Sequence, residues 1–452
     1  MIDKAREIAL KILYKIDKEG AYSNLALDEI IKQNHNILNE KDIGLISEIV
    51  YGVTTWKLTI DEIIKKYSNI KLKKISPFIL NILRMSIYQI IFLDKIPKSA
   101  AVNEGVNLAK RYGHKSSAGF TNAILRKVNK DDYEEMFKIE DDTQRISKTT
   151  SMPIWIIEEL KKENMPIEKI EEICENSNER PKISIRVNRL KIMPNELKEK
   201  LEDKSIKVEN GILEDFLILN KTKNIESMQE FREGLFTVQD EAAGLTALIL
   251  NPRQGQNILD ACSSPGGKTT YIAEIVENKA KIEAWDIHNH RTKLVEQTAK
   301  RLGVNIIETK VQDASKYEQK YFEKFDKILL DVPCLGLGVL KRKPDIKWQK
   351  KPEDIKEISE IQYSILNNCS KYLKSGGELV YSTCSILKEE NQNIITRFLK
   401  ENLNFETQKI MLPKGANNTK NYFEKFLIDE TFLQVYQNEK TDGFFICKLQ
   451  KK

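Results

Sequence analysis

The chain has 452 residues, more than one compact domain usually holds, so we expect two or three domains. Hydrophobic residues make up 40% of it and charged residues 31%, which provides for packed cores and excludes a chain that is disordered throughout. Residues 1–130 contain 22 Lys and Arg against 13 Asp and Glu, a net +9, whereas the rest of the chain carries −3. A basic module beside a near-neutral one indicates a part that binds a polyanion, the alternative being a lysine-rich surface that serves solubility.

The sequence indicates neither a membrane segment nor a secretory signal. Its most apolar stretch, residues 75–93, is interrupted by Asn81, Arg84 and Gln89, whereas a membrane helix needs roughly 18 uninterrupted apolar residues. The first residues include Asp3 and lack an apolar segment. We therefore expect a cytosolic protein without a membrane partner.

Six cysteines are spread along the chain, and no two form a C-x-x-C pair. Neither a disulfide framework nor a zinc site is indicated, and we expect no metal. Thiols stay reduced in the cytosol, so each cysteine is by default a small buried residue, and the question is whether any acts as a nucleophile. The cysteines are Cys174, Cys262, Cys334, Cys369, Cys384 and Cys447.

Residues 1–130 predict an all-α bundle, because apolar residues recur there at the three- and four-residue spacing of a helix face. Proline supports two boundaries, since Pro77 suits a first helical turn and Pro97 ends a helix that starts near Phe78. The predicted helices lie at 5–16, 25–31, 43–53, 60–67, from 78 to about 96, from about 100, and at 120–128.

Three further segments follow the bundle. Residues 131–149 are acidic with little apolar periodicity and are predicted to be a linker or a frayed helix that crosses between domains. Residues 150–234 mix a helix at 154–163 with a strand at 183–188, which indicates a small α+β module. From 235 to 452, strands alternate with helices, a pattern typical of a doubly wound, mostly parallel sheet that binds ligands at the carboxyl ends of its strands.

The first strand of this last domain runs into the loop DACSSPGGKT at 260–269. Its glycine pair allows a tight turn and a close approach of the backbone to a ligand, just before a helix whose first amides face the same place. A P-loop would need glycine where Cys262 stands, and the G-x-G-x-x-G dinucleotide fingerprint is absent. Both nucleotide motifs are therefore excluded.

Acidic residues recur where successive strands end, at Asp260, Asp286, Asp313 and Asp331. Such carboxylates suit the hydroxyls of a ribose and the amino group of an adenine, so an adenosine ligand without a pyrophosphate fits best, and S-adenosylmethionine is the obvious candidate. The alternative for each aspartate is that it caps the helix that follows. Four aspartates at the ends of successive strands, beside a glycine pair, favour cofactor binding over helix capping.

Two cysteines also follow predicted strands. Cys334 lies in DVPC and Cys384 in YSTCS. Because the strand ends of a doubly wound sheet open on one crevice, the two thiols are predicted to meet there, and Cys384 is then a candidate nucleophile. The alternative for each is an inert buried thiol.

The strings DACSSPGGKT, DVPC and YSTCS resemble the RNA 5-methylcytosine methyltransferases in order and spacing, and TVQDEAAG around Asp240 resembles the entry to their catalytic domain. The segments ILRMSIYQIIFLDKIPKSAAVNEGVNLAKRYG and AGFTNAILRKV resemble the NusB-like RNA-binding domain of the bacterial Sun/Fmu branch, whose substrate is small-subunit (16S) ribosomal RNA. Where that family commonly has two alanines, this chain has Ser263 and Ser264, and small residues still fit the turn.

The resemblance implies a Rossmann-like methyltransferase domain that methylates carbon 5 of a cytosine. Carbon 5 is a poor nucleophile until a thiolate adds at carbon 6, and the resemblance assigns this thiolate to Cys384, product release to Cys334, and a contact with N3 of the base to Asp331. The base must leave its stack to be reached. The implied S-adenosylmethionine contacts are Cys262, Ser263, Ser264, Pro265, Gly266, Gly267, Lys268, Asp286, Asp313 and Asp331.

The basic segment 341–351 is predicted to hold the RNA backbone through Lys341, Arg342, Lys343 and Lys347, with Trp348 as a stacking surface. The alternative is a solvated charge run followed by a tryptophan of the core.

Three other functions stay open. The first is a non-catalytic RNA-binding antitermination or assembly factor. The second is an enzyme that uses Cys334 as nucleophile in the manner of DNA cytosine methyltransferases. The third is an enzyme that performs the same chemistry on transfer RNA. Two intact cysteine motifs argue against the first, and the N-terminal domain argues against the others. We expect ribosomal RNA as the partner, no DNA, and a monomer, although the sequence leaves the oligomeric state open.

Overall fold

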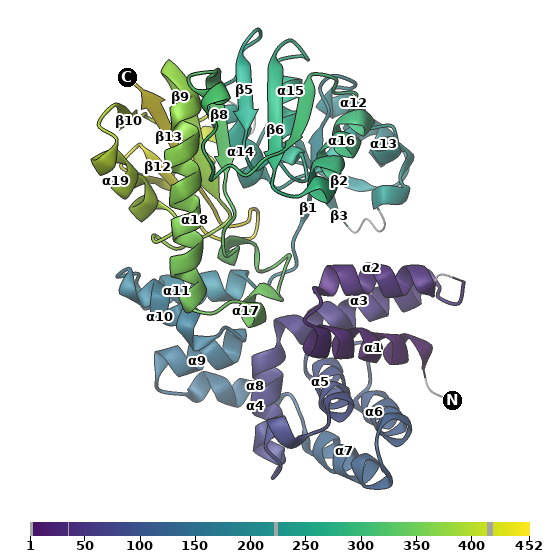
Figure 1. Ribbon diagram of the computed structural model, residues 1–452. Coiled ribbons are helices and arrows are strands. Elements are labelled where there is room, and N and C mark those ends of the chain that lie inside the picture. The colour runs from purple at the N-terminus through teal and green to yellow at the C-terminus, as the bar shows by residue number, and fades with distance from the viewer. Residues whose placement is uncertain (1–2, 35, 221–224, 414–418) are drawn as a thin grey trace. The chain divides into compact units, whose positions relative to one another are not determined.

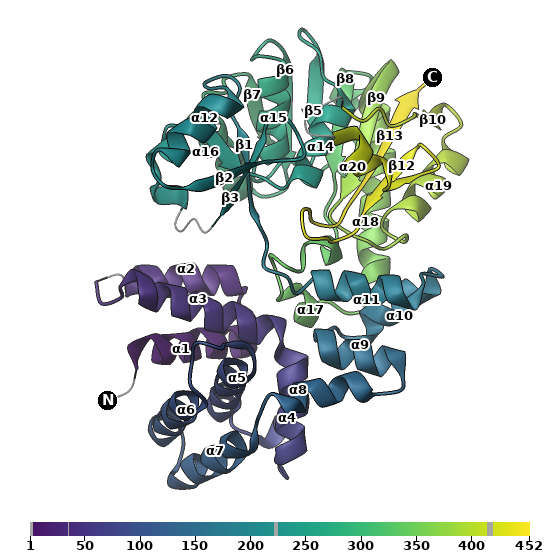
Figure 2. The same cartoon turned by 180° about the vertical axis from the view of Figure 1, so that it is seen from behind.

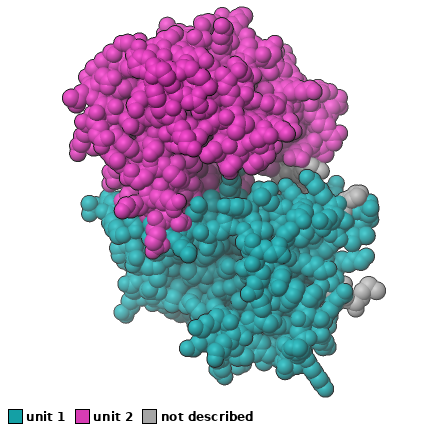
Figure 3. All heavy atoms as spheres, viewed as in Figure 1, with its two compact units in different colours: residues 1–179, 340–352 teal, residues 180–339, 353–452 magenta. Residues whose placement is uncertain are grey.

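The computed structural model describes residues 3–34, 36–220, 225–413 and 419–452. The chain forms two compact units (Figure 3). Unit 1 consists of residues 1–179 together with 340–352, and unit 2 consists of residues 180–339 together with 353–452. A segment that lies between two elements of unit 2 in the sequence is therefore part of unit 1.

Unit 1 is helical, as predicted. In α1, for example, Ala5, Ile8 and Ile12 are buried on one face, and Asp3 caps the helix by accepting a hydrogen bond from the backbone N–H of Arg6. Its α-helices are α1 (Lys4–Glu19), α2 (Ser23–Gln33), α3 (Glu40–Thr55), α4 (Lys57–Tyr67), α5 (Pro77–Phe92), α6 (Lys98–Tyr112), α7 (Lys115–Lys127), α8 (Asp131–Glu134), α9 (Asp142–Thr150), α10 (Ile154–Lys162), α11 (Ile167–Asn176) and α17 (Ile346–Gln349).

Residues 131–149, predicted to be a linker or a frayed helix between domains, are a helical part of unit 1. This segment forms α8 and α9, and Asp132 is buried because it accepts hydrogen bonds from Lys66 Nζ at 2.8 Å and Tyr67 Oη at 2.6 Å. Tyr133 packs edge-on against Trp56, with 5.9 Å between ring centroids. Lys66 and Tyr67 on α4 thus stabilise the buried carboxylate of Asp132, and the boundary between the units falls after residue 179 instead of at 149.

Unit 2 begins with a small antiparallel sheet whose strand order is β2-β3-β1-β4. The expected α+β module is present, but the helix predicted at 154–163 belongs to unit 1 as α10. The elements of this module are β1 (Ile183–Val187), α12 (Pro194–Glu202), β2 (Lys207–Asn210), β3 (Phe216–Asn220), α13 (Gln229–Arg232) and β4 (Phe236–Val238).

The large sheet has the order β11-β12-β13-β9-β8-β5-β6-β7, with β10 beside β13. Strands β5 to β9 are parallel, as predicted, while the C-terminal strands add an antiparallel side. Its elements are α14 (Glu241–Leu250), β5 (Asn257–Asp260), α15 (Gly267–Ile275), β6 (Lys281–Asp286), α16 (Asn289–Leu302), β7 (Ile307–Val311), β8 (Phe325–Asp331), α18 (Glu353–Cys369), β9 (Leu373–Thr383), α19 (Gln392–Glu401), β10 (Phe405–Thr407), α20 (Thr419–Glu424), β11 (Leu427–Ile428), β12 (Phe432–Val435) and β13 (Phe444–Lys451).

Helices cover both faces of this sheet (Figures 1 and 2). Successive strand residues point to opposite faces, so Ile258 packs with α14, α15 and α16, whereas its neighbour Leu259 packs with α18 and α19. Leu329 and Leu330 on β8 divide between the two cores in the same way. This confirms the doubly wound domain, and the carboxyl ends of β5, β6 and β8 with the end of β9 form the edge on which the candidate site lies.

No helix among the described residues is both long enough and apolar enough to cross a membrane.

Candidate functional site

The loop 261–266 lies at the carboxyl end of β5, where Asp260 ends the strand. The backbone N–H and the hydroxyl of Ser263 both donate to the carbonyl of Trp285 at 2.9 Å, which fixes the loop against β6. Gly266 has φ +101°, a conformation that favours glycine, and it caps α15. The first amides of α15 are thereby directed to the strand edge, where they suit a bound group with acceptor atoms.

Asp260 itself holds this turn together. It is buried, and its Oδ2 accepts a hydrogen bond from Thr269 Oγ1 in the first turn of α15 at 2.6 Å. Burial raises the pKa of Asp260 to about 7. Asp260 therefore stabilises the loop by joining the end of β5 to the first turn of α15.

Asp286 and Asp313 extend the same edge. Asp286 ends β6, and one of its oxygens accepts the backbone N–H of His288 at 2.9 Å. Asp313 accepts both the N–H and the hydroxyl of Ser315, and these bonds outweigh burial and lower the pKa of Asp313. Because α15 is capped by Gly266 and α16 by His288, the aspartates that end β5 and β6 are not the caps of the next helices.

Asp331, at the end of β8, has both carboxylate oxygens engaged. Oδ2 lies 2.7 Å from Lys268 Nζ, and Oδ1 accepts the hydroxyl of Ser382 at 2.9 Å. Burial disfavours the charged form of Lys268, but the negative charge of Asp331 and its hydrogen bond to the ammonium outweigh this effect and raise the pKa of Lys268. Lys268 is thus a charged group directed into the site, and Ser382 is a site residue that sequence reasoning missed.

The two predicted cysteines are brought together. Cys334 Sγ and Cys384 Sγ lie 2.9 Å apart, and both are free thiols. The reason is the parallel pairing of β8 and β9, in which Asp331 is opposite Ser382 and both strands end at the same edge. The hydrogen bond to Cys384, together with burial, raises the pKa of Cys334 well above its usual range, so Cys334 stays protonated.

The other four cysteines lie outside this pair. Burial raises the pKa of the Cys174 thiol to about 12 and raises the pKa values of Cys369 and Cys447 further. Cys262, in the loop 261–266, also has its pKa raised by burial and by the neighbouring Cys369 and Asp260. These thiols remain neutral.

Two glycines let the backbones of the cysteine loops touch. The N–H of Gly338 donates to the carbonyl of Cys384 at 2.9 Å, and the N–H of Gly443 donates to the carbonyl of Gly338 at 2.8 Å. A Cβ on Gly338 would lie 2.7 Å from the Cys384 oxygen and 2.1 Å from the Gly443 oxygen, which no side chain tolerates. The loop after Cys334 is thus anchored to the loop that carries Cys384.

A buried glutamate, Glu390, also joins the two loops. It accepts the backbone N–H of Leu335 at 2.8 Å and the hydroxyl of Ser385. Its neighbour Asn391 accepts the hydroxyl of Thr383 at 2.6 Å. Sequence reasoning missed both residues, although an acidic pair followed by asparagine shortly after YSTCS was a visible signal.

Arg186 on β1 was also missed. It is fully buried and donates to the carbonyl of Gly267 at 2.6 Å and to Gln239, and it forms an ion pair with Glu274 at 2.7 Å. Its guanidinium also lies over the ring of Tyr271, 4.6 Å from the centroid. An arginine amid the apolar residues of ISIRV was the available signal, since such a residue needs a partner inside the fold.

The expectation that Lys347 holds the RNA backbone is wrong. Lys347 is 1% exposed, and its Nζ donates to the carbonyl of Thr55 at 3.0 Å and to Asn178 Oδ1 at 2.9 Å within unit 1. The indole N–H of Trp348 donates a hydrogen bond to the carbonyl of Thr54 at 2.7 Å. Of the remaining basic residues, Lys343 is exposed while Lys341 and Arg342 are half-buried, and an RNA contact by these three stays a prediction.

Burial of Lys347 predicts a pH-dependent stability. Burial lowers its pKa to about 7, whereas a lysine in an unfolded chain titrates near ~10.4. Between these values the unfolded chain binds more protons, so the free energy of unfolding rises with pH, by up to about 1.4 kcal/mol per pH unit. We expect Lys347→Met to lose this rise in urea unfolding between pH 7 and 10.

The exposed Lys343 provides the matched control, because Lys343→Met changes the same charge in the same segment and should keep the slope of the wild type. If the free energy of unfolding of Lys347→Met rose with pH as steeply as that of the wild type, the lowered pKa of Lys347 would be contradicted.

Comparison with known proteins agrees with this geometry. Residues 247–450 match the family model described as 16S rRNA methyltransferase RsmB/F, residues 3–130 match the NusB family, and residues 152–226 match the ferredoxin-like domain of RsmF/B-like methyltransferases. The probable ribosomal RNA small subunit methyltransferase B of Bacillus subtilis is 37% identical over 449 residues, 99% of this chain and 98% of the relative. The corresponding Synechocystis protein is 32% identical over 450 residues, 99% of each chain.

Solved structures show the same relationship. The protein PH0851 superposes with a TM-score of 0.80 at 26% identity and covers 100% of both chains. A methyltransferase homolog protein from Pyrococcus horikoshii superposes with a TM-score of 0.54 at 27% identity, over 66% of this chain and 99% of that one. The resemblance seen in the sequence is confirmed, and the chain belongs to the RsmB/F family of 16S rRNA methyltransferases.

Proposed function

We propose that this chain transfers a methyl group from S-adenosylmethionine to carbon 5 of a cytosine in small-subunit (16S) ribosomal RNA, through a covalent bond between Cys384 and carbon 6 of the base. The observation that carries the proposal is the pair of thiols 2.9 Å apart, next to the Asp331–Lys268 ion pair. The relatives at 37% and 32% identity are named as methyltransferases of small-subunit ribosomal RNA, which supports the substrate.

The strand edge fits S-adenosylmethionine. Gly267 leaves room for the cofactor, because a Cβ there would have only Gln239 nearby, at 3.7 Å, and the carboxylates of Asp286 and Asp313 suit ribose hydroxyls and an adenine amino group. We assign the contacts to the loop 262–268, Asp286, Asp313 and Asp331. When bound, the cofactor supplies an electrophilic methyl group on a sulfonium and leaves as S-adenosylhomocysteine.

Cys384 starts the reaction on an unstacked cytosine. Its thiolate adds to carbon 6, and the electron pair of the carbon 5–carbon 6 double bond becomes available at carbon 5 for the methyl group. The ammonium of Lys268 interacts with Cys384 and stabilises the anionic sulfur. Asp331, held by Lys268 and Ser382, contacts N3 as the ring takes up a proton there from water, and this proton returns to water when the aromatic ring re-forms.

Release reverses the addition. The proton on carbon 5 passes to a water molecule, its electron pair re-forms the double bond, and the bond from carbon 6 to Cys384 breaks with return of the electrons to sulfur. Cys334 remains a neutral thiol beside the leaving sulfur, so its S–H can donate to the departing thiolate. This is the role in product release that we assign to Cys334.

The test incubates the full chain, in separate reactions, with small-subunit ribosomal RNA and with transfer RNA, each together with S-adenosylmethionine that carries a labelled methyl group. We expect the label in RNA, and digestion to nucleosides should release it as 5-methylcytidine. Label only in transfer RNA would move the substrate to that class, and no transfer to any RNA would favour the non-catalytic binding factor.

A further inference from the structure

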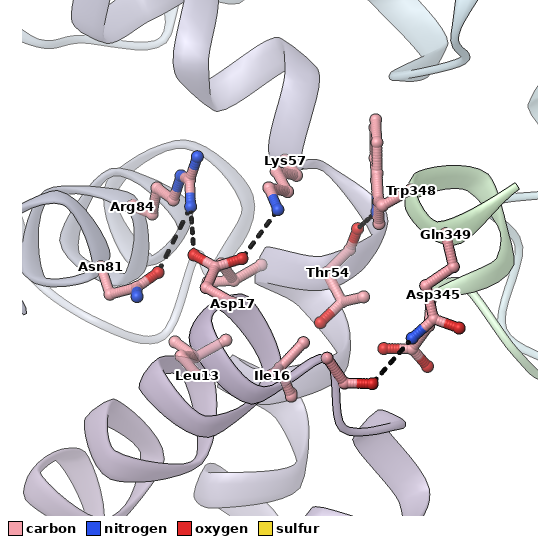
Figure 4. A pocket seen from close by; sticks show the side chains of 12 residues that line it. Leu13, Ile16, Asp17, Thr54, Lys57, Asn81, Arg84, Asp345, Trp348 and Gln349 are labelled. Atoms are coloured by element: carbon pink, nitrogen blue, oxygen red, sulfur yellow. Dashed lines mark hydrogen bonds and ion pairs between the residues drawn. The ribbon is translucent and has the colours of Figure 1, made fainter. Parts of the chain in front are cut away.

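Unit 1 contains a cavity of about 210 Å³ that belongs to none of the chemistry above (Figure 4). One wall comes from the helical bundle and the other from α17 and the residue before it, which the chain supplies from between β8 and α18. The lining residues are Leu13, Ile16, Asp17, Gly20, Val53, Thr54, Lys57, Asn81, Arg84, Asp345, Trp348 and Gln349.

Two buried polar atoms in the cavity wall have no hydrogen-bond partner within the described residues. They are the amide nitrogen of Asn81, a residue 1% exposed, and Oδ1 of Asp345, a residue 3% exposed. The second polar atom of each side chain is engaged, since Arg84 donates to Asn81 Oδ1 and Ser23 donates to Asp345 Oδ2 at 2.6 Å. A buried donor or acceptor without a partner is costly, so this wall calls for a ligand that offers an acceptor to Asn81 and a donor to Asp345.

The charges of the wall favour a neutral ligand. The two cations, Arg84 and Lys57, are both bound to Asp17, at 2.5 Å and 2.7 Å. Asp345 adds a second carboxylate on the opposite side of the cavity. A phosphate would meet neutralised cations and a repelling carboxylate, whereas an uncharged group with donor and acceptor edges would not.

The remaining wall is apolar. Leu13, Ile16 and Val53 contribute aliphatic surface, and the indole of Trp348 contributes a flat one. A volume of about 210 Å³ holds one ring system, or several waters at about 30 Å³ each. Nucleobases combine flat apolar faces with adjacent donors and acceptors on their edges.

We propose that this cavity accepts one unstacked nucleobase, with Asn81 donating to a ring acceptor and Asp345 accepting from an amino or imino group. The base comes from a single-stranded stretch of RNA, which rests on the proposed function, and a free nucleoside is the alternative source of the same chemistry. Because α17 forms one wall, the site exists only in the full chain and not in a fragment of residues 1–179.

The test measures binding of fluorescent cytidine, adenosine and uridine decamers to the full chain by anisotropy. Asn81→Leu removes the donor at similar size, and Ile16→Phe fills the cavity. We expect each to raise the dissociation constant by about tenfold for at least one decamer, the size of one lost base contact. Ile30→Phe is the matched control, because Ile30 is also partly buried on the bundle core but does not line the cavity.

A second measurement keeps the proposal falsifiable if Ile16→Phe fails to fold. A uridine decamer with one 4-thiouridine is photo-crosslinked to wild type, and we expect the adduct on the peptide that contains Trp348. Wild-type affinity in folded Asn81→Leu, or crosslinks confined to other peptides, would overturn the proposal. Binding of free cytidine or adenosine that no decamer displaces would keep the pocket and assign it to a free nucleoside.

Methyl transfer to ribosomal RNA is followed in the same preparations, which separates the two proposals. Transfer without any decamer in the cavity would reject the cavity and retain the enzyme. Crosslinking at Trp348 without methyl transfer would retain the nucleobase cavity and reject the proposed enzymatic function.

Discussion

Cys384→Ser should abolish methyl transfer and leave no covalent complex with RNA, whereas Cys334→Ser should accumulate a protein–RNA adduct that survives denaturant. A serine hydroxyl is a far weaker nucleophile than a thiolate at neutral pH, so we expect the turnover of Cys384→Ser to fall by about 10⁴-fold or more. Cys334→Ser retains the nucleophile but loses the thiol that faces the leaving sulfur at 2.9 Å, so addition outruns release. Labelled methyl transfer and gel electrophoresis in denaturant measure both results.

Cys174→Ser is the control, because this thiol lies buried on α11 in unit 1 and should leave transfer and adduct formation at the wild-type level. Exchanged phenotypes, with adduct in Cys384→Ser and none in Cys334→Ser, would make Cys334 the nucleophile. The fold and the cofactor assignment would survive that result, but the order of the chemistry would be that of DNA cytosine methyltransferases.

The features that the sequence predicts well are those set by neighbouring residues. The helical spacing from Ala5 to Ile16 requires a buried face, and observed α1 buries Ala5, Ile8 and Ile12. The thiol pair is predictable for a related reason, since a parallel sheet aligns the ends of its strands and so brings Cys334 to Cys384.

The features that the sequence predicts poorly depend on partner residues that lie far away along the chain. Lys347 lies in a run of basic residues that is typical of a solvated loop, yet it is buried, and Thr55, 292 positions away, supplies a carbonyl that accepts a hydrogen bond from its Nζ. Asp132 is likewise buried through Lys66 and Tyr67, which lie on another helix. The charge of a segment shows that it needs partners but does not show whether those partners are water, RNA or protein.

Arg186 is a distant partner of the proposed cofactor site. Arg186→Met should lower the free energy of unfolding of unit 2 by about 3 to 5 kcal/mol, because it leaves the carboxyl group of Glu274 buried and without its cation. It should also weaken S-adenosylmethionine binding, because the carbonyl of Gly267 loses the hydrogen bond that holds the cofactor loop. Chemical unfolding and isothermal titration calorimetry measure the two effects.

The double variant Arg186→Met/Glu274→Met separates the effect on stability from the effect on cofactor affinity. Replacing a whole buried ion pair by apolar side chains is often neutral for stability, so we expect the free energy of unfolding to return to within about 1 kcal/mol of wild type. The bond to Gly267 stays missing, and cofactor affinity should remain about tenfold below wild type, the equivalent of about 1.4 kcal/mol. Arg189→Met, which removes a partly exposed pair with Asp215 in the turn after the same strand, should change neither by much.

If the double variant regained full cofactor affinity together with stability, Arg186 would act only through the fold. If stability returned while affinity did not, the small module would be part of the cofactor site, because a side chain from β1 would determine where the backbone of the glycine loop lies. That second outcome is the one we expect, since the guanidinium donates both to Gly267 and to Gln239, and a methionine can replace neither bond.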